Sequence, residues 1–326
     1  MPKNIAASAA ALIIILAGIV FACVSYVRKA GRSETSFTAM DTACNITLYS
    51  KKHEKEYINE IARLDKELDR YNKESTVYIF NDTGSAELSE DAALLFEQSK
   101  ELYNEYGNVD VTCGGLISLW GITGDSPEVP SASEIKSELL KTGFDKIERQ
   151  GSRFKTTVST QLDFGATAKG YALDRIKRKL LANSEKCAVV SLGSSTLLFG
   201  KKPDKSSFTV AVRDPKAPDR ILLEFETDEG FVSTSGGYER YFDSGAQRYI
   251  HILDLKTGAP VLTDLESVTV IADSGIKSDF LSTAILIDGT PGLEKHLSTD
   301  DYQLIAVTSS GEIRYSPSLE GKIKLK

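Results

Sequence analysis

Short apolar runs that often follow one another directly dominate the second half of the chain. Six of them are rich in β-branched residues and have the length of strands: "CAVVSL", "FTVAVRD", "ILLEFE", "YIHILDL", "SVTVIA" and "YQLIAVTS". Strands outnumber the helical patterns between them, and strands that are joined without a crossover helix pair antiparallel. The pattern therefore favours an α+β fold with mainly antiparallel sheets over a doubly wound parallel sheet.

Apolar residues at helical spacing predict the helices that flank these sheets. One set lies among charged residues and would bury one face of a helix: Tyr57, Ile61, Leu64 and Leu68. Further helices are expected from Ser89 to Gly107, from Ser131 to about Gly143, from about Ala168, and from Ile276 to Ile287. Glu134 completes a capping box with Ser131. The segment "SFTAMDTACNITLYS", Ser36 to Ser50, is predicted to be a strand.

Residues 1–30 stand apart from the rest of the chain because they contain a long uncharged run. This run, "IAASAAALIIILAGIVFACVSYV", ends at Arg28 and is long enough to span a bilayer. Its short basic start and its small residues also suit a secretory signal. The stretch "VFAC", which ends at Cys23, resembles a bacterial lipobox, although Phe21 is a poor residue inside that motif. A lipid anchor at Cys23 and an uncleaved membrane helix are therefore both open.

Either anchor would hold the rest of the chain at the cell membrane. We expect it on the extracytoplasmic side, although Arg28, Lys29 and Arg32 oppose export because positive residues prefer the cytoplasmic face. No repeat or domain break follows the N-terminal segment, so residues 34–326 are predicted to form one large domain.

Charge and cysteine usage exclude several classes of protein. The formal net charge is −7, which leaves no basic footprint for nucleic acid. Beyond Cys23, the chain has Cys44, Cys113 and Cys187, which form no C-x-x-C pair. Zinc and thioredoxin-like chemistry are therefore not expected, and buried apolar cysteines are the simplest interpretation.

The stretch "LDFGATAKGYALD", Leu162 to Asp174, sets small residues between two aspartates. Gly165 and Gly170 lie five positions apart, with Lys169 directly before the second glycine. Neither a Walker A loop nor a dinucleotide-binding fingerprint has this spacing. On its own, the stretch predicts a glycine turn that leads into an amphipathic helix.

Two polar features of the C-terminal half suit metal or anion chemistry. In the helix expected from Ile276 to Ile287, Asp279 and Thr283 lie four positions apart and share a face. A carboxylate and a hydroxyl there could join the oxygen ligands of Mg²⁺, although a solvated helix face has the same spacing. The segment "STSGGYERYF" is either an anion-binding turn or an ordinary polar turn between strands.

His251 and Trp120 are candidates from two apolar segments. His251 lies within the strand-like run "YIHILDL", where a structural histidine is the simplest interpretation. An imidazole there could also move a proton or hold a phosphate. Trp120 follows "VDVTCGGLISL" and is either a core residue or a platform for a flavin or adenine ring.

Taken in order, eight segments resemble the ApbE family, the FAD:protein FMN transferases. They are "FTAMDTACNITLYS", "VDVTCGGLISLWGI", "LDFGATAKGYALD", "VVSLGSSTLLFG", "VAVRDP", "STSGGYERYF", "YIHILDLKTGAP" and "SVTVIADSGIKSDFLSTAILIDG". The resemblance implies an α+β fold of the T-fold kind in an exported, anchored or periplasmic bacterial protein. It also implies an enzyme that binds FAD and Mg²⁺, cleaves the pyrophosphate, and places FMN on a threonine or serine hydroxyl of a partner protein, releasing AMP.

The same resemblance implies roles for individual residues. Positions that match FAD contacts are Met40, Tyr71, Leu119, Trp120, Gly121, Asp163 and Lys169. The Ala166 backbone carbonyl and the side chains of Asp279 and Thr283 match magnesium ligands. His251 matches a histidine at the flavin site and is the candidate for proton transfer, although a nearby aspartate could serve equally.

Two other functions stay open at the level of sequence. One is a hydrolase that cuts FAD to FMN and AMP, and the other is a non-catalytic lipoprotein that binds flavin. For a transferase, the resemblance implies acceptor proteins such as subunits of Rnf-type or sodium-pumping Nqr-type redox complexes, or other exported flavoproteins.

Overall fold

The computed structural model describes residues 32–50, 52–124, 126–245 and 247–326. Within these ranges, no helix is both long enough and apolar enough to cross a membrane. The predicted signal or anchor, residues 1–30 with Cys23, lies outside the described residues.

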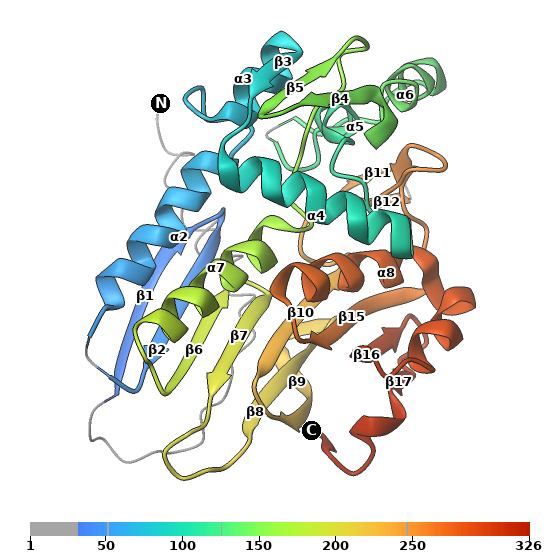
Figure 1. Cartoon of the computed structure of the whole chain (residues 1–326). Coiled ribbons are helices and arrows are strands. Elements are labelled where there is room, and N and C mark those ends of the chain that lie inside the picture. The colour runs from blue at the N-terminus through green and yellow to red at the C-terminus, as the bar shows by residue number, and fades with distance from the viewer. Residues whose placement is uncertain (1–31, 51, 125, 246) are drawn as a thin grey trace, which may run out of the picture.

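An eight-stranded sheet forms the centre of the molecule (Figure 1). Its strand order is β1-β2-β6-β7-β10-β15-β16-β17, and every neighbouring pair is antiparallel. The bounds are β1 (Ser33–Ala39), β2 (Thr42–Leu48), β6 (Cys187–Leu192), β7 (Ser195–Gly200), β10 (Gly230–Gly236), β15 (Leu265–Ala272), β16 (Gln303–Thr308) and β17 (Ile313–Tyr315). The predicted α+β class with mainly antiparallel sheets is confirmed.

The long helices lie together on one side of this sheet (Figure 1). They are α2 (Glu54–Leu68), α4 (Glu90–Tyr106), α7 (Ala168–Ala182) and α8 (Gly275–Leu297). The apolar set predicted for α2 is fully confirmed, since all four of its members are buried. Ser89 caps α4 by accepting a hydrogen bond of 3.2 Å from the Ala92 N–H. The helix expected to end at Ile287 continues as α8 through a kink at Gly289, where φ is 65°.

A small sheet covers the opposite face of the central sheet. Its strands are β18 (Ile323–Leu325), β9 (Ala217–Thr227) and β8 (Phe208–Asp214), in that order. One buried apolar cluster joins the two sheets, because alternate residues of the central strands, such as Val189, Leu198 and Val232, pack against Val210 and Phe225. The molecule thus has three layers: helices, central sheet and small sheet.

Short elements gather beyond one end of the central sheet (Figure 1). The helical ones are α3 (Thr76–Thr83), α5 (Gly114–Trp120), α6 (Ala132–Leu139) and η1 (Phe144–Lys146). The strands form a sheet of β3 (Ser85–Glu87), β5 (Arg153–Thr156) and β4 (Ile147–Gln150), and two hairpins, β11 (Tyr241–Ser244) with β12 (Gln247–Ile250) and β13 (Leu253–Asp254) with β14 (Ala259–Pro260). A second 3₁₀ helix besides η1, η2 (Pro317–Leu319), follows β17.

Residues 36–50 form a hairpin, so the prediction of one strand is wrong. Met40 and Asp41 join β1 to β2 with φ values of 52° and 55°. Two consecutive positive φ angles are what a two-residue hairpin turn requires. Neither residue is glycine or asparagine, so the sequence lacks the usual signal for this turn.

Three further segments differ from their predictions. The segment "STSGGYERYF" begins in a strand, because Ser233 to Gly236 belong to β10 in the middle of the central sheet, and its turn covers only Gly237 to Arg240. "YIHILDL" is not one strand, because His251 interrupts it between β12 and β13. The helix opened by Ser131 has the predicted capping box but ends at Leu139, before Gly143.

Candidate active site

Helices α7 and α8 cross with their backbones in contact. A Cβ atom on Gly170 would lie 2.1 Å from the carbonyl oxygen of Gly275, and a Cβ on Gly275 would lie 2.2 Å from that of Gly170. Only glycine permits this close approach of two backbones. The crossing brings the loop before α7 against the first turns of α8, where Asp279 lies.

Asp279 is the centre of the contact between the two helices and the sheet. Its side chain is buried, and its residue is 5% exposed. One carboxylate oxygen accepts a hydrogen bond of 2.9 Å from the Gly170 N–H on α7. The other accepts one of 2.8 Å from Ser195 Oγ on β7. Residues from two other elements, α7 and β7, thus fix the orientation of this carboxylate.

The other two predicted metal ligands lie in the same region. The Thr283 hydroxyl, one turn beyond Asp279, is 3.0 Å from Ser235 Oγ on β10 and donates to the Asp279 carbonyl at 3.4 Å. Ala166, in the loop before α7, packs against the apolar cluster that includes α8. Thr283 therefore lies one turn from Asp279 on α8, and Ala166 lies in the loop that leads into α7.

This set of donors fits Mg²⁺ better than a softer metal. No group of three or more His, Cys, Asp or Glu side chains that could hold a metal ion is found among the described residues. One carboxylate, one hydroxyl and one carbonyl instead suit a hard cation that keeps waters and binds substrate phosphates. Asp279 forms no ion pair with any described residue, since both of its hydrogen-bond donors are uncharged. A buried carboxylate without a cationic partner is costly, and a divalent cation would compensate it.

Lys169 brings a positive charge to this site. It directly precedes Gly170, and its charge acts on Glu239 and His251, which come from the loop after β10 and the break after β12. Desolvation raises the pKa of the Glu239 carboxyl, while Lys169 and a hydrogen bond from Ser194 oppose that rise. Segments that are distant in sequence therefore place two cations, Lys169 and Arg240, near His251.

His251 is held as a neutral imidazole. Desolvation of this partly buried ring lowers its pKa to about 4, and the charges of Arg240 and Lys169 lower it further against the effect of a hydrogen bond to the Arg240 carbonyl. That carbonyl lies 3.1 Å from Nδ1. Because a carbonyl only accepts, the neutral ring must carry its proton on Nδ1. Nε2 is then left with a free lone pair that can take up a proton.

Asp163 is fixed by Arg70, a residue that the sequence analysis did not single out. The Arg70 guanidinium donates to Asp163 Oδ2 at 3.0 Å and to the Gly114 carbonyl at 2.9 Å. It also donates to Ser118 Oγ at 2.8 Å and to Gln161 Oε1 at 3.0 Å. Arg70 therefore joins the end of α2 to α5 and to the strand-like segment before the glycine loop.

Trp120 is packed as a core residue, which was one of two interpretations. It is 2% exposed, and its Nε1–H donates to the Gly258 carbonyl at 2.8 Å. The ring of Tyr249 lies 5.5 Å from the Trp120 ring, at an angle of 33°. Use of the indole as a stacking platform would therefore need Tyr249 to move.

The remaining predicted FAD contacts lie around these residues. Tyr71 is 62% exposed and has the Arg70 guanidinium above its ring, 5.3 Å from the centroid. Met40 forms the turn between β1 and β2. Leu119 belongs to α5, and Gly121 ends that helix with φ of 61°. A Cβ on Gly121 would lie 2.9 Å from the Ser126 carbonyl, so glycine is required there.

Asp174 was quoted in the sequence analysis only as the end of the glycine segment. In the structure it caps α8, because its two oxygens each accept a hydrogen bond of 2.9 Å, from the Gly275 and Ile276 N–H groups. Its only sequence signal is its place one turn after Gly170 on α7. Such a capping partner from another helix cannot be read from local spacing.

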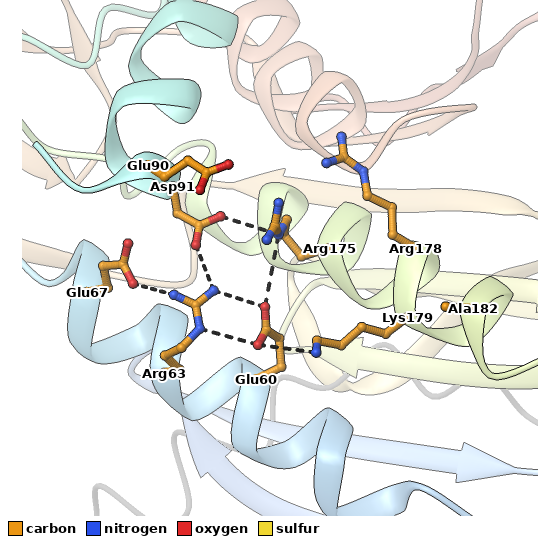
Figure 2. A pocket seen from close by; sticks show the side chains of 9 residues that line it. All are labelled: Glu60, Arg63, Glu67, Glu90, Asp91, Arg175, Arg178, Lys179 and Ala182. Atoms are coloured by element: carbon orange, nitrogen blue, oxygen red, sulfur yellow. Dashed lines mark hydrogen bonds and ion pairs between the residues drawn. The ribbon is translucent and has the colours of Figure 1, made fainter. Parts of the chain in front are cut away.

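A separate cavity of about 610 Å³ lies between α2, α4 and α7 (Figure 2). None of the predicted site residues lines it. Most of its charges pair with one another: Arg63 contacts Asp91 at 2.7 Å, and Arg175 contacts Asp91 at 3.3 Å (Figure 2). This network joins three helices and lies apart from the α7–α8 site.

Comparison with known proteins gives a consistent class for this fold and site. A FAD:protein FMN transferase of Klebsiella pneumoniae (strain 342) is 32% identical over 63% of this chain and 64% of the relative. One of Treponema pallidum (strain Nichols) is 29% identical over 81% of this chain and 80% of the relative. The crystal structure of an ApbE protein from Thermotoga maritima aligns with a TM-score of 0.81 at 29% identity, covering 89% of this chain and 99% of that chain.

Residues 40–307 match the ApbE family, and the chain therefore belongs to that family. The relatives are named for the transfer of FMN from FAD to protein. The family, the class of enzyme and the transfer of FMN from FAD to protein expected from the sequence are thus confirmed.

Proposed function

We propose that this chain uses Mg²⁺ to transfer FMN from FAD to a threonine or serine hydroxyl of another protein, with release of AMP. The observation that carries the metal-dependent part is Asp279, a buried carboxylate that has two neutral hydrogen-bond donors and forms no ion pair among the described residues. It lies against the first turn of α7, which carries Lys169, whose charge suits a phosphate group.

Asp279, Thr283 and the Ala166 carbonyl would hold the magnesium ion. Mg²⁺ bound there would offset negative charge on the pyrophosphate while the bond to AMP breaks. Lys169 adds a fixed positive charge near the same phosphates. The FAD contacts proposed around them are Met40, Tyr71, Leu119, Trp120, Gly121, Asp163 and Lys169, with Arg70 fixing Asp163.

His251 is the proposed catalytic base. The acceptor hydroxyl attacks the phosphorus of the FMN half, its proton passes to a base, and the bond between this phosphorus and the bridging oxygen breaks, so that AMP leaves. A hydroxyl is a poor nucleophile at neutral pH and needs such a base. The pKa of about 4 and the contact of Nδ1 with the Arg240 carbonyl support a neutral ring with a free Nε2.

One experiment, which includes an acceptor domain, tests both the metal dependence and the transfer of FMN. The chain is incubated with FAD and either Mg²⁺ or excess chelator, and AMP release is measured with and without the acceptor. A transferase needs the acceptor for full AMP release, whereas a FAD hydrolase runs at full rate alone. A flavin-binding lipoprotein without catalytic activity would release no AMP in any mixture. Loss of turnover in Asp279→Ala, with FAD binding retained, is the result expected for a metal ligand.

The N-terminal run supports a further part of the proposal, which concerns location. We expect residues 1–30 to attach the enzyme to the cell membrane, facing the extracytoplasmic side, through lipidated Cys23 or a helix. Acceptors would then be exported or membrane redox proteins such as Rnf-type or Nqr-type subunits. Fractionation of cells that express wild-type and Cys23→Ala chains, with labelled fatty acid, separates a lipid anchor from a helix. Release of both chains into the soluble fraction would contradict an anchor of either kind.

A further inference from the structure

A row of three serines, two fully buried and one partly buried, lines the face of the central sheet beneath α8. Ser195 on β7 and Ser233 on β10 are directly paired across the two strands, and both are 0% exposed. Ser235 follows two positions later on β10. Contacts between a helix and a sheet are normally apolar, and the neighbouring parts of α8 follow that rule, since Phe280, Leu281 and Ile285 are fully buried in an apolar cluster.

Each serine of this row has a different partner on α8. Ser195 donates to Asp279 Oδ1 at 2.8 Å. Ser233 lies 2.9 Å from Ser278 Oγ, so it contacts only another serine. Ser235 lies 2.8 Å from Ser282 Oγ and 3.0 Å from Thr283 Oγ1. The row therefore contains one serine that contacts the carboxylate and one, equally buried, that does not.

Buried hydroxyl groups cost free energy unless they are hydrogen-bonded, and even then they contribute less than well-packed apolar groups. The Ser195 hydroxyl donates its hydrogen bond to Asp279, the carboxylate that α8 places against this row of serines. Together with the Gly170 N–H on the other oxygen, it fixes rotation about the Cβ–Cγ bond of Asp279. A carboxylate has about four lone-pair sites, so two neutral donors leave the remaining ones for a cation.

We propose that Ser195 is a positioning residue that sets the orientation of Asp279 for metal binding. This inference rests on the proposed function, because it takes Asp279 as a ligand of Mg²⁺. Ser195 acts through Asp279 and does not itself touch the metal. Partners that orient metal ligands typically change metal affinity 10- to 100-fold when they are removed.

The experiment measures Mn²⁺ binding by electron paramagnetic resonance on the full chain in the presence of excess FAD. Four proteins are compared: the wild type, Ser195→Ala, Ser233→Ala and Asp279→Ala. Ser233→Ala is the matched control, because it removes an equally buried hydroxyl from the same pair of strands without touching Asp279. Melting temperatures of all four proteins are measured in the same buffer.

We expect Ser195→Ala to weaken Mn²⁺ binding about 10-fold or more and Ser233→Ala to leave it within about 2-fold, with similar melting temperatures for the two serine variants. Equal Mn²⁺ affinity in these two variants would overturn the role of Ser195. If Asp279→Ala still loses Mn²⁺ in that case, the metal site of the proposed function stands and only this inference fails. If Asp279→Ala binds Mn²⁺ as the wild type does, both fail.

Discussion

Gly170 and Gly275 meet backbone to backbone where α7 crosses α8, so that a single methyl group on either one would overlap the carbonyl oxygen of the other. The proposed metal ligands lie on both sides of this crossing, Ala166 before α7 and Asp279 on α8. The distance between the two halves of the site is therefore set by main-chain contact and not by flexible side chains.

Gly170→Ala is expected to separate the two helices and to remove the hydrogen bond between residue 170 and Asp279. Overpacking of this kind costs about 1–3 kcal/mol, and backbone cannot move aside as a side chain can. Urea unfolding and AMP release measure the two effects. The control is Gly115→Ala, because a Cβ at Gly115 would meet only the end of the flexible Glu138 side chain. Equal stability and activity of the two variants would contradict the role of the crossing.

Asp174→Ala removes the acceptor for the first two N–H groups of α8. Loss of such a cap typically costs about 0.5–2 kcal/mol, and we expect a destabilisation in that range by urea unfolding at pH 7. Burial raises the pKa of the Asp174 carboxyl, so the charge itself is unfavourable there. Asp174→Asn keeps one acceptor and removes the charge, and it should stay closer to the wild type than Asp174→Ala does. If Asp174→Asn were less stable than Asp174→Ala, the charge of Asp174, and not its capping of α8, would be what stabilises the protein.

Arg70→Ala breaks a pair with Asp163 that is largely removed from water, since the two side chains are 9% and 14% exposed. Removing one partner of such a pair costs about 3–5 kcal/mol. Arg70→Lys should recover only part of the stability that Arg70→Ala loses, because an ammonium group cannot reproduce the planar fork that reaches four acceptors. FAD affinity by flavin fluorescence should fall in both variants. Arg153→Ala, which breaks an exposed ion pair with Glu87, is the control and should change stability by no more than about 1 kcal/mol.

The ring of His251 is expected to titrate with a midpoint of about 4 in the ligand-free protein. A pKa lowered from its ordinary 6.5 means that the neutral ring contributes stability above pH 6.5, and that this contribution is lost as the pH falls towards 4. NMR of the imidazole protons measures the midpoint. Unfolding of the wild type and His251→Gln between pH 7 and pH 4 should show a stability difference that shrinks as the solution becomes more acidic. A midpoint at 6.5 would contradict the desolvated site.

Local periodicity was enough to predict the main helices and the central strands β6, β15 and β16, but not β7, β10 or β17. The buried face of α2 and the caps at Ser89 and Ser131 follow from side chains within one turn of each other. The turn at Met40 and Asp41 was missed because this pair lacks the glycine that usually marks a two-residue hairpin turn. Its conformation is stabilised by the pairing of β1 with β2 over their whole length, which no local pattern reveals.

The site was predictable only in part, for a related reason. Asp163, Lys169, Asp279 and Thr283 could be named from motifs in order along the chain. Arg70, Asp174 and Ser195 could not, because each acts on a residue far away in sequence. The serines of β10 were read as a turn, since polar residues beside two glycines normally lie at the surface. Here they lie under α8, where Ser233 contacts Ser278 and Ser235 contacts Ser282 and Thr283.

The central claim is that this site moves FMN from FAD to a protein when Mg²⁺ is present. The most direct test is the intact mass of an acceptor domain after incubation with the enzyme, FAD and Mg²⁺, beside the same acceptor with its target threonine or serine changed to alanine. The account predicts one added FMN on the intact acceptor, none on the alanine variant, and none when Asp279→Ala replaces the enzyme. An acceptor that stays unmodified while FAD is cut to FMN and AMP at full rate would contradict it.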